Sequence, residues 1–231
     1  MQDLPIRLQM VFEQVKASCP GNASGRIIDV GSDHGYLAVR CLEEDIARSA
    51  ICTEIHKAPA QRSANALEEA GFADRSEVYV TDGLKGISLC KGDIVVIAGM
   101  GGLNIIDIMS RAFSDNPKNV LEKVVFVIQP QKSNEIVRNY LAKAGFFFLE
   151  ESVCVDRDIF YNCIRTVFKG ISVALTSEQA CYGPVLLKKY AAGDELVKDY
   201  FGHLNKLFEV RQRSNPVVKA ALEERLKNEG T

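Results

Sequence analysis

The chain has 231 residues, with a hydrophobic fraction of 47%, a charged fraction of 25% and a formal net charge of −2 at pH 7. This length suits one domain with an appendage or two small domains, and the near-neutral charge gives no sign of a nucleic-acid-binding face at the level of composition. No apolar run approaches the roughly 18 residues of a membrane-spanning helix, and the first residues lack a signal-peptide pattern, so we expect a cytoplasmic protein that uses no membrane.

Seven cysteines are spread along the chain without a Cys-x-x-Cys pair. Several of them stand in apolar runs, which is typical of small buried side chains in a reducing compartment. We therefore expect free thiols and no metal site.

A first helix is predicted over 6–17 by apolar residues at helical spacing: Ile6, Met10, Val11 and Val15. The tripeptide Pro20-Gly21-Asn22 should end it. Short apolar runs, typical of buried strands, follow at 26–30, 49–54, 77–80, 93–98 and 123–128. Helices are expected between them at about 35–45, 58–70, 103–113 and 133–144, the last with Ser133 as its cap and Gly145 at its end. This alternation indicates a parallel sheet that is covered on both faces.

The pattern changes after residue 145. Two longer strand-like runs, 146–155 and 159–169, are separated only by Asp156-Arg157-Asp158, which predicts an antiparallel hairpin at the end of the sheet. Beyond residue 170 the chain becomes helical, and Pro184 suits a first helical turn. One helix is predicted by the stripe Val197, Phe201, Leu204 and Phe208, and a second, over 217–229 after the break at Asn215-Pro216, by Val218, Leu222 and Leu226. We therefore expect an α/β domain over 1–170 and a helical hairpin, resembling a coiled coil, over 171–231.

The candidate site lies where the predicted parallel strands end, because ligands of open parallel sheets bind beyond the carboxyl ends of the strands. Acids recur there: Asp29 on the first strand, Glu54 on the second and Asp82 after the third. A glycine-bearing turn over 31–35 follows the first strand and precedes a helix, so it can bring backbone N–H groups close to a ligand.

Each of these features has a possible role with a nucleoside. Glu54 stands 23 residues after Gly31, where an acid can accept hydrogen bonds from both hydroxyls of a ribose. Asp82 beside Gly83 could accept a hydrogen bond from the exocyclic amine of an adenine, and the glycines of 99–102 leave room for a planar ring. A solvated acid at a strand end, an Asp-Gly turn and a strand-to-helix turn are the respective structural alternatives.

The spacing of the first turn distinguishes between two cofactors. It reads Gly-x-Asp-x-Gly and not the Gly-x-Gly-x-x-Gly of dinucleotide sites. An aspartate in this place would repel the pyrophosphate of NAD, whereas it would attract a ligand that carries a sulfonium and an ammonium group. The turn and the three acids therefore favour S-adenosylmethionine.

Four segments together resemble the bacterial tRNA (adenine-N1)-methyltransferases that modify adenine 22 in the D-arm, the TrmK family: Asp29-Val-Gly-Ser-Asp-His-Gly-Tyr-Leu37, Asp82-Gly83-Leu84, Ile97-Ala-Gly-Met-Gly-Gly102 and Gln129-Pro130. Arg7-Leu8 and Tyr182-Gly183-Pro184 also look like flanking features of that family, while Gly35 stands where relatives often carry alanine.

The resemblance implies a Rossmann-like class I methyltransferase domain that binds S-adenosylmethionine, and a helical coiled-coil domain that helps to hold tRNA. It also implies methyl transfer to N1 of an adenine. The candidate cofactor-binding residues are Asp29, Gly31, Ser32, Asp33, Gly35, Tyr36, Glu54, Ile55, Asp82, Gly83, Ala98, Gly99, Met100 and Gly101.

Three residues are candidates for the chemistry. Adenine N1 can attack the sulfonium methyl with its in-plane lone pair, and a nearby carboxylate would stabilise the charge that develops on the ring or accept an N6 proton. Asp33 is the first candidate, although it could instead face the cofactor or serve the turn alone. His34 could bind the substrate or cap the helix, and Arg7 could reach a phosphate or the target base or be a solvated surface residue.

His56 and His203 belong to no visible constellation and are interpreted as surface residues. Phosphates of tRNA could be held by basic residues of the tail, or these could form an ordinary solvated face. These candidates are Lys188, Lys189, Lys198, Lys206, Arg211, Arg213 and Lys219.

Two other functions stay open. The protein could methylate another substrate, such as a protein or a small molecule, or it could be a non-catalytic adaptor that binds RNA or a partner protein. A monomer is favoured, although an exposed helical hairpin could also form a dimer contact.

Overall fold

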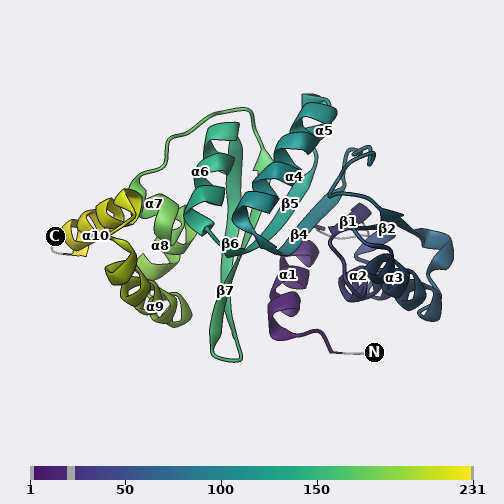
Figure 1. The fold of residues 1–231 in the computed structure, drawn as a ribbon, viewed down its shortest axis with the longest axis horizontal. Coiled ribbons are helices and arrows are strands. Elements are labelled where there is room, and N and C mark those ends of the chain that lie inside the picture. The colour runs from purple at the N-terminus through teal and green to yellow at the C-terminus, as the bar shows by residue number, and fades with distance from the viewer. Residues whose placement is uncertain (1–2, 20–23, 230–231) are drawn as a thin grey trace.

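The structure, a computed structural model, describes residues 3–19 and 24–229, and it contains one seven-stranded sheet with helices on both faces (Figure 1). The strands are β1 Ser24–Val30, β2 Ala47–Glu54, β3 Ser76–Val80, β4 Ile94–Gly101, β5 Val125–Lys132, β6 Phe146–Asp156 and β7 Ile159–Phe168. The α-helices among the described residues are α1 Ile6–Lys16, α2 Tyr36–Glu43, α3 Lys57–Glu69, α4 Gly102–Asp115, α5 Lys118–Leu121, α6 Asn134–Ala144, α7 Ser177–Tyr182, α8 Pro184–Ala191, α9 Glu195–Arg211 and α10 Pro216–Glu229. A 3-10 helix, η1 Ala73–Arg75, precedes β3.

The strand order is β3-β2-β1-β4-β5-β7-β6. The strands β1 to β5 pair in parallel, and β7 pairs antiparallel with both β5 and β6. The predicted α/β fold with a terminal antiparallel hairpin is therefore confirmed. Because β1 lies between β2 and β4, the chain changes direction across the sheet at β1, and this is where open parallel sheets place their ligand sites.

The apolar character of the central strands follows from burial on both faces. In β1, Ile28 and Val30 join the core that lies under α4 and α6, while Ile27 joins the core under α1, α2 and α3. Successive side chains of a strand point to opposite faces, so a strand covered on both sides has to be apolar at almost every position. Asp29 is the exception in β1, and it is buried.

Two strands run further than their sequence suggested. The predicted ends at residues 98 and 128 are wrong, because β4 continues to Gly101 and β5 to Lys132. The pairing passes two register shifts around Met100, which are typical of a β-bulge. Gly99 allows this irregularity because its φ is +75°, a conformation that residues with a side chain rarely adopt.

The ends of α6 differ in how well they were predicted. Gly145 ends the helix in the left-handed conformation, as expected. Ser133 stands at the N-cap position, but its φ is +63° and its side chain makes no capping hydrogen bond, so the predicted cap is wrong. The predicted terminator Pro20-Gly21-Asn22 lies outside the described residues.

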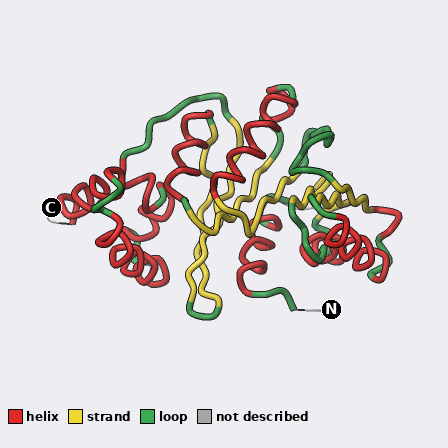
Figure 2. Tube along the Cα trace, viewed as in Figure 1, coloured by secondary structure: helices red, strands yellow, loops and turns green. Residues whose placement is uncertain are grey.

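The tail contains the two predicted helices, now α9 and α10, together with α7 and α8 (Figures 1 and 2). The stripe of α9 is buried as predicted: Val197, Phe201, Leu204 and Phe208. In α10 Val218 is buried, but Leu226 is 71% exposed, so its predicted place in the stripe is wrong. Arg225 is buried instead, with its guanidinium carbon 4.2 Å from the ring centre of Tyr190. Cation–π contact lets a charged side chain take a position that the apolar pattern assigned to leucine.

The cysteines are free, as expected, and five of the seven are buried: Cys41, Cys52, Cys154, Cys163 and Cys181. No helix within residues 3–19 and 24–229 has both the length and the apolar character that crossing a bilayer requires.

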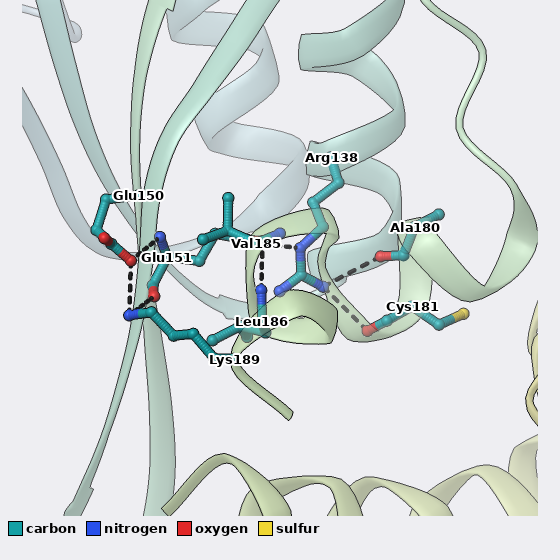
Figure 3. Close-up of polar contacts among 8 residues, drawn as sticks. All are labelled: Arg138, Glu150, Glu151, Ala180, Cys181, Val185, Leu186 and Lys189. Carbon is teal, nitrogen blue, oxygen red and sulfur yellow. Dashed lines mark hydrogen bonds and ion pairs between the residues drawn. The ribbon is translucent and has the colours of Figure 1, made fainter. Parts of the chain in front are cut away.

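A buried ion pair joins the tail to the sheet (Figure 3). Arg138 of α6 donates from Nε to Glu151 Oε1 of β6 at 2.8 Å, and both side chains are fully buried. Arg138 also donates to the carbonyl oxygens of Ala180 and Cys181 at the end of α7. Glu151 Oε2 in turn accepts the backbone N–H of Val185 at the start of α8, at 2.8 Å. Four elements are thus held by two charges.

We predict that Glu151→Ala lowers the free energy of unfolding by about 3–5 kcal/mol, because it leaves the Arg138 guanidinium buried without its counter-charge. Urea denaturation measures this loss. Glu195→Ala is the matched control, since Glu195 pairs with Lys198 in solvent and its removal should change little. Equal losses in the two variants would contradict the prediction.

Candidate functional site

Two cavities lie at the carboxyl edge of the parallel strands. The first, of about 410 Å³, opens beyond β1, β2 and β3 and is bordered by α4. The second, of about 400 Å³, lies between the turn after β1, the start of α1 and the ends of β4 and β5. Gly31 lines both, so the cavities adjoin at the turn that follows β1.

The structure distributes the predicted site residues between these cavities. The first is lined by the candidates Gly31, Glu54, Ile55, Asp82, Gly83 and Met100. The second is lined by the candidates Arg7, Asp29, Gly31, Ser32, Asp33, His34, Tyr36, Ala98 and Gly99. Gly35 and Gly101 line neither cavity.

The turn after β1 is a tight structure built from left-handed residues. Gly31, Asp33 and Gly35 have φ values of +73°, +55° and +69°. Gly35 occupies the N-cap position of α2, where an added Cβ would lie 3.2 Å from the backbone of Ser63 in α3. Gly35 therefore lets α2 and α3 pack closely beneath the turn. It takes the cap position that was one of the predicted alternatives for His34, and that alternative is wrong.

Glu54 fastens this turn to the neighbouring strand. Its Oε1 accepts the backbone N–H of Asp33, and the N–H of Gly31 donates to the carbonyl oxygen of Thr53 at 2.8 Å. The carboxylate is nearly buried, at 8% exposure. A strand-end acid that is bound in this way is not an ordinary solvated residue.

Asp29 is buried at the floor of the second cavity. Burial first, and the charge of Glu54 second, raise the pKa of Asp29 to about 7. A cation placed beside this carboxyl would favour its charged form and lower its pKa again.

Asp33 and Asp82 each meet an arginine from a following helix. Asp33 Oδ1 lies 2.6 Å from Arg62 of α3, and both side chains are partly exposed. Asp82 accepts two hydrogen bonds from Arg111 of α4, at 2.7 and 3.1 Å. These hydrogen bonds hold the pKa of Asp82 below its usual value.

Arg7 reaches the second cavity from α1. Its Nη1 donates to Gln129 Oε1 at 2.9 Å, and the same oxygen accepts the N–H of Gly99 at 3.1 Å. Gln129 is fully buried. Arg7 is therefore held on the bulge of β4 through one carboxamide, which explains why a polar residue ends the apolar run of β5.

Sequence patterns missed several polar residues that line or support the cavities. They are Thr53, Thr81, Asn104, Asp107, Arg111 and Gln131 at the walls, and Arg62 behind Asp33. Asp107 and Arg111 form an ion pair at i, i+4 within α4, the one signal that could have drawn attention to this helix. The contacts with Asp82 and Asp33 join positions 29 residues apart and leave no local pattern.

Among residues 3–19 and 24–229, no group of three His, Cys, Asp or Glu side chains is arranged to hold a metal ion. The cavities instead combine buried carboxylates, backbone amides in a glycine-rich turn and two arginines, Arg7 and Arg111. This set of groups fits a ligand that has both cationic and hydroxyl groups.

Comparison with known proteins shows the class to which the chain belongs. Residues 4–164 match the protein family described as Methyltransferase domain. A Bacillus subtilis relative, tRNA (adenine(22)-N(1))-methyltransferase, is 27% identical over 190 residues, which are 79% of this chain and 74% of the relative. Of the solved structures, a Streptococcus pneumoniae protein in complex with S-adenosyl-L-methionine is 26% identical, with a TM-score of 0.76 over 94% of this chain and 97% of that chain. The B. subtilis M1A22 tRNA methyltransferase TrmK is 24% identical, with a TM-score of 0.74 over 99% and 96% of the two chains.

The fold and the site thus define a methyltransferase of the Rossmann-like type. The chain belongs to the methyltransferase-domain family, and the resemblance that its motifs indicated is confirmed.

The raised pKa of Asp29 predicts a pH-dependent stability. The native state keeps the proton up to about pH 7, whereas the unfolded chain loses it near pH 4, so the free energy of unfolding falls as the pH rises between these values. Asp29→Asn removes this loss and should be more stable than the parent protein at pH 8, by roughly 4 kcal/mol at most, and similar to it at pH 4. Denaturation at the two pH values measures the difference. A constant difference between the variants at both pH values would contradict it.

Proposed function

We propose that the protein transfers the methyl group of S-adenosylmethionine to N1 of an adenine in tRNA, at the position equivalent to adenine 22 of the D-arm. The observation that carries this proposal is the pair of adjoining cavities, of which one is lined by Glu54 and Asp82 and the other by Asp29 and Asp33. One cavity suits the nucleoside of the cofactor, and the other suits its amino-acid end together with the target base.

The residues of the first cavity would hold the nucleoside. Glu54 has Oε2 available for ribose hydroxyls, because the turn uses Oε1. Asp82 and Ile55 border the place of the adenine, where Arg111 shares the Asp82 carboxylate. Asp29 would receive the ammonium group. When bound, the cofactor supplies an electrophilic methyl group on a sulfonium.

The second cavity would receive the target base. N1 of adenine faces its partner in a base pair, so the base has to leave its stack to enter. Asp33 and His34 border the entrance, and Arg7 lies deeper beside Gly99. The Asp33 carboxylate would stabilise the positive charge that develops on the ring, and Arg62 holds it in place.

The division into a catalytic domain over 1–170 and a tRNA-holding domain over 171–231 is part of the proposal. Among the seven basic candidates of the tail, ion pairs engage Lys189, Lys198, Arg211 and Lys219 with nearby acids. Lys188, Lys206 and Arg213 are therefore stronger candidates for phosphate contacts than the three paired lysines, and Arg211 stays a candidate because its ion pair leaves other N–H donors of the guanidinium. We further propose that the protein acts in the cytoplasm as a monomer.

The reaction is tested with labelled S-adenosylmethionine and an unmodified tRNA transcript, followed by mapping of the methylated nucleoside. We expect 1-methyladenosine at one position of the D-arm. Asp33→Asn should lower kcat by about 100-fold or more while cofactor affinity is kept, since it removes a charge that acts on the transition state. His56→Ala is the control, because His56 lies at the start of α3 outside both cavities. Full activity of Asp33→Asn would remove Asp33 from the mechanism.

Cofactor binding is tested separately by calorimetry. Glu54→Gln should weaken the affinity for S-adenosylmethionine by about tenfold, because an amide is a poorer acceptor for two hydroxyls than a carboxylate. Glu77→Gln, on β3 and away from both cavities, is the matched control. If the parent protein does not bind the cofactor at all, the adaptor function becomes the better explanation.

A further inference from the structure

A third cavity, of about 370 Å³, lies where the turn between β5 and α6, the β6–β7 hairpin and α9 meet, and we call it the junction groove. Its lining includes Gln131, Lys132, Ile159, Phe160, His203 and Leu207. Gln131 also lines the second cavity of the candidate site, so the groove continues from the place proposed for the target base.

The walls of the groove are unusual for a solvent-facing surface. The rings of Phe160 and His203 lie 5.2 Å apart, on the hairpin and on α9. Ile159 is 54% exposed and Leu207 is 46% exposed, so the apolar lining is open to solvent. Exposed apolar side chains that gather in a groove mark a binding surface more often than they serve the fold.

The rim of the same groove carries positive charge. Lys132 is exposed at the end of β5, and Arg211 of α9 keeps 43% of its side chain exposed although one nitrogen pairs with Glu135 at 2.5 Å. An arginine has five N–H donors, so this ion pair leaves others for a second acceptor. Aromatic and apolar walls below cationic side chains are the combination that binds a base together with its phosphate.

We propose that the junction groove holds the nucleotide next to the target adenine in the RNA strand. The RNA strand continues beyond the base that enters the second cavity. The junction groove adjoins that cavity at Gln131, which lines both, so it is the surface that the next nucleotide reaches. The neighbouring base stacks against His203 and Phe160, and its phosphate meets Lys132 and Arg211. This inference rests on the proposed function and adds a second point of substrate recognition to it.

The groove is formed from both parts of the chain, and the buried ion pair keeps them in register. Phe160 belongs to the hairpin of the sheet, while His203 and Leu207 belong to the tail. Arg138 and Glu151 hold the start of α8 against β6. Because α9 follows α8 in the chain, this attachment also sets where α9 lies relative to the sheet. The groove is therefore already formed in the structure, without a change in how the tail lies against the sheet.

The test compares His203→Ala with Val210→Ala, which removes an exposed side chain from the same helix outside the groove. With the intact tRNA transcript, His203→Ala should lower kcat/KM by about tenfold, because stacking on one ring contributes this much per base. Val210→Ala should stay within about twofold of the parent protein. Thermal unfolding verifies that both variants are folded.

A second substrate separates stacking from a general effect on the enzyme. Transcripts that lack the base on the 5′ or the 3′ side of the target adenine are assayed one at a time. One of them should lower kcat/KM of the parent protein by about tenfold but leave that of His203→Ala almost unchanged, since the contact is already missing.

Each outcome decides one proposal. The groove does not hold a neighbouring base if the loss of kcat/KM caused by His203→Ala and the loss caused by removing the base multiply when the two changes are combined. The same conclusion follows if the parent protein methylates the intact transcript but His203→Ala behaves like Val210→Ala. Equal kcat/KM of the parent protein on the intact transcript and on both transcripts that lack a base would also overturn the stacking contact. If the parent protein methylates no tRNA, the proposed function fails and takes this inference with it.

Discussion

The buried pair of Arg138 and Glu151 is the interaction on which the arrangement of the chain depends. Two fully buried charges are costly unless each finds several partners, and here the carboxylate serves the first turn of α8 while the guanidinium serves the last turn of α7. The sheet and the tail thus share one polar centre. Gly183 reflects this closeness, since a Cβ there would lie 2.6 Å from the Glu151 carboxylate. The tail is attached through charge as well as through apolar packing.

The candidate site has a related electrostatic design. Its acids are not left as a bare negative surface: Asp33 meets Arg62, Asp82 meets Arg111, and Asp29 is held near its point of protonation. Repulsion between acids at neighbouring strand ends is reduced in this way. Two of the acids thus keep an arginine beside them, and the third is neutral when it carries its proton.

Much of the fold could be predicted, because a strand that is buried on both faces must be apolar at almost every position, and most of β1, β2, β4 and β5 is buried in this way. The acids and glycines at the strand ends could be placed at one edge, because the carboxyl ends of parallel strands lie at the same edge of a sheet. Contacts between distant segments could not: Arg111 and Arg62 meet their acids only in the folded chain. Leu226 was assigned to the core because a helical period counts only apolar side chains as buried. It does not show that the neighbouring Arg225 can be buried instead, against aromatic rings. The bulge at Met100 depends on pairing with β5, which no local pattern reveals.

Met100 lines the first cavity and lies against the residue at which the two cavities adjoin. A Cβ on Gly31 would collide with Met100 Cε, so the tip of this side chain rests against the residue that both cavities share. A methionine is unbranched and turns about three bonds at little cost. A ligand that spanned both cavities across Gly31 would have to displace this thioether. The space at Gly31 is therefore set by the reach of one flexible side chain, and not by the charges that surround it.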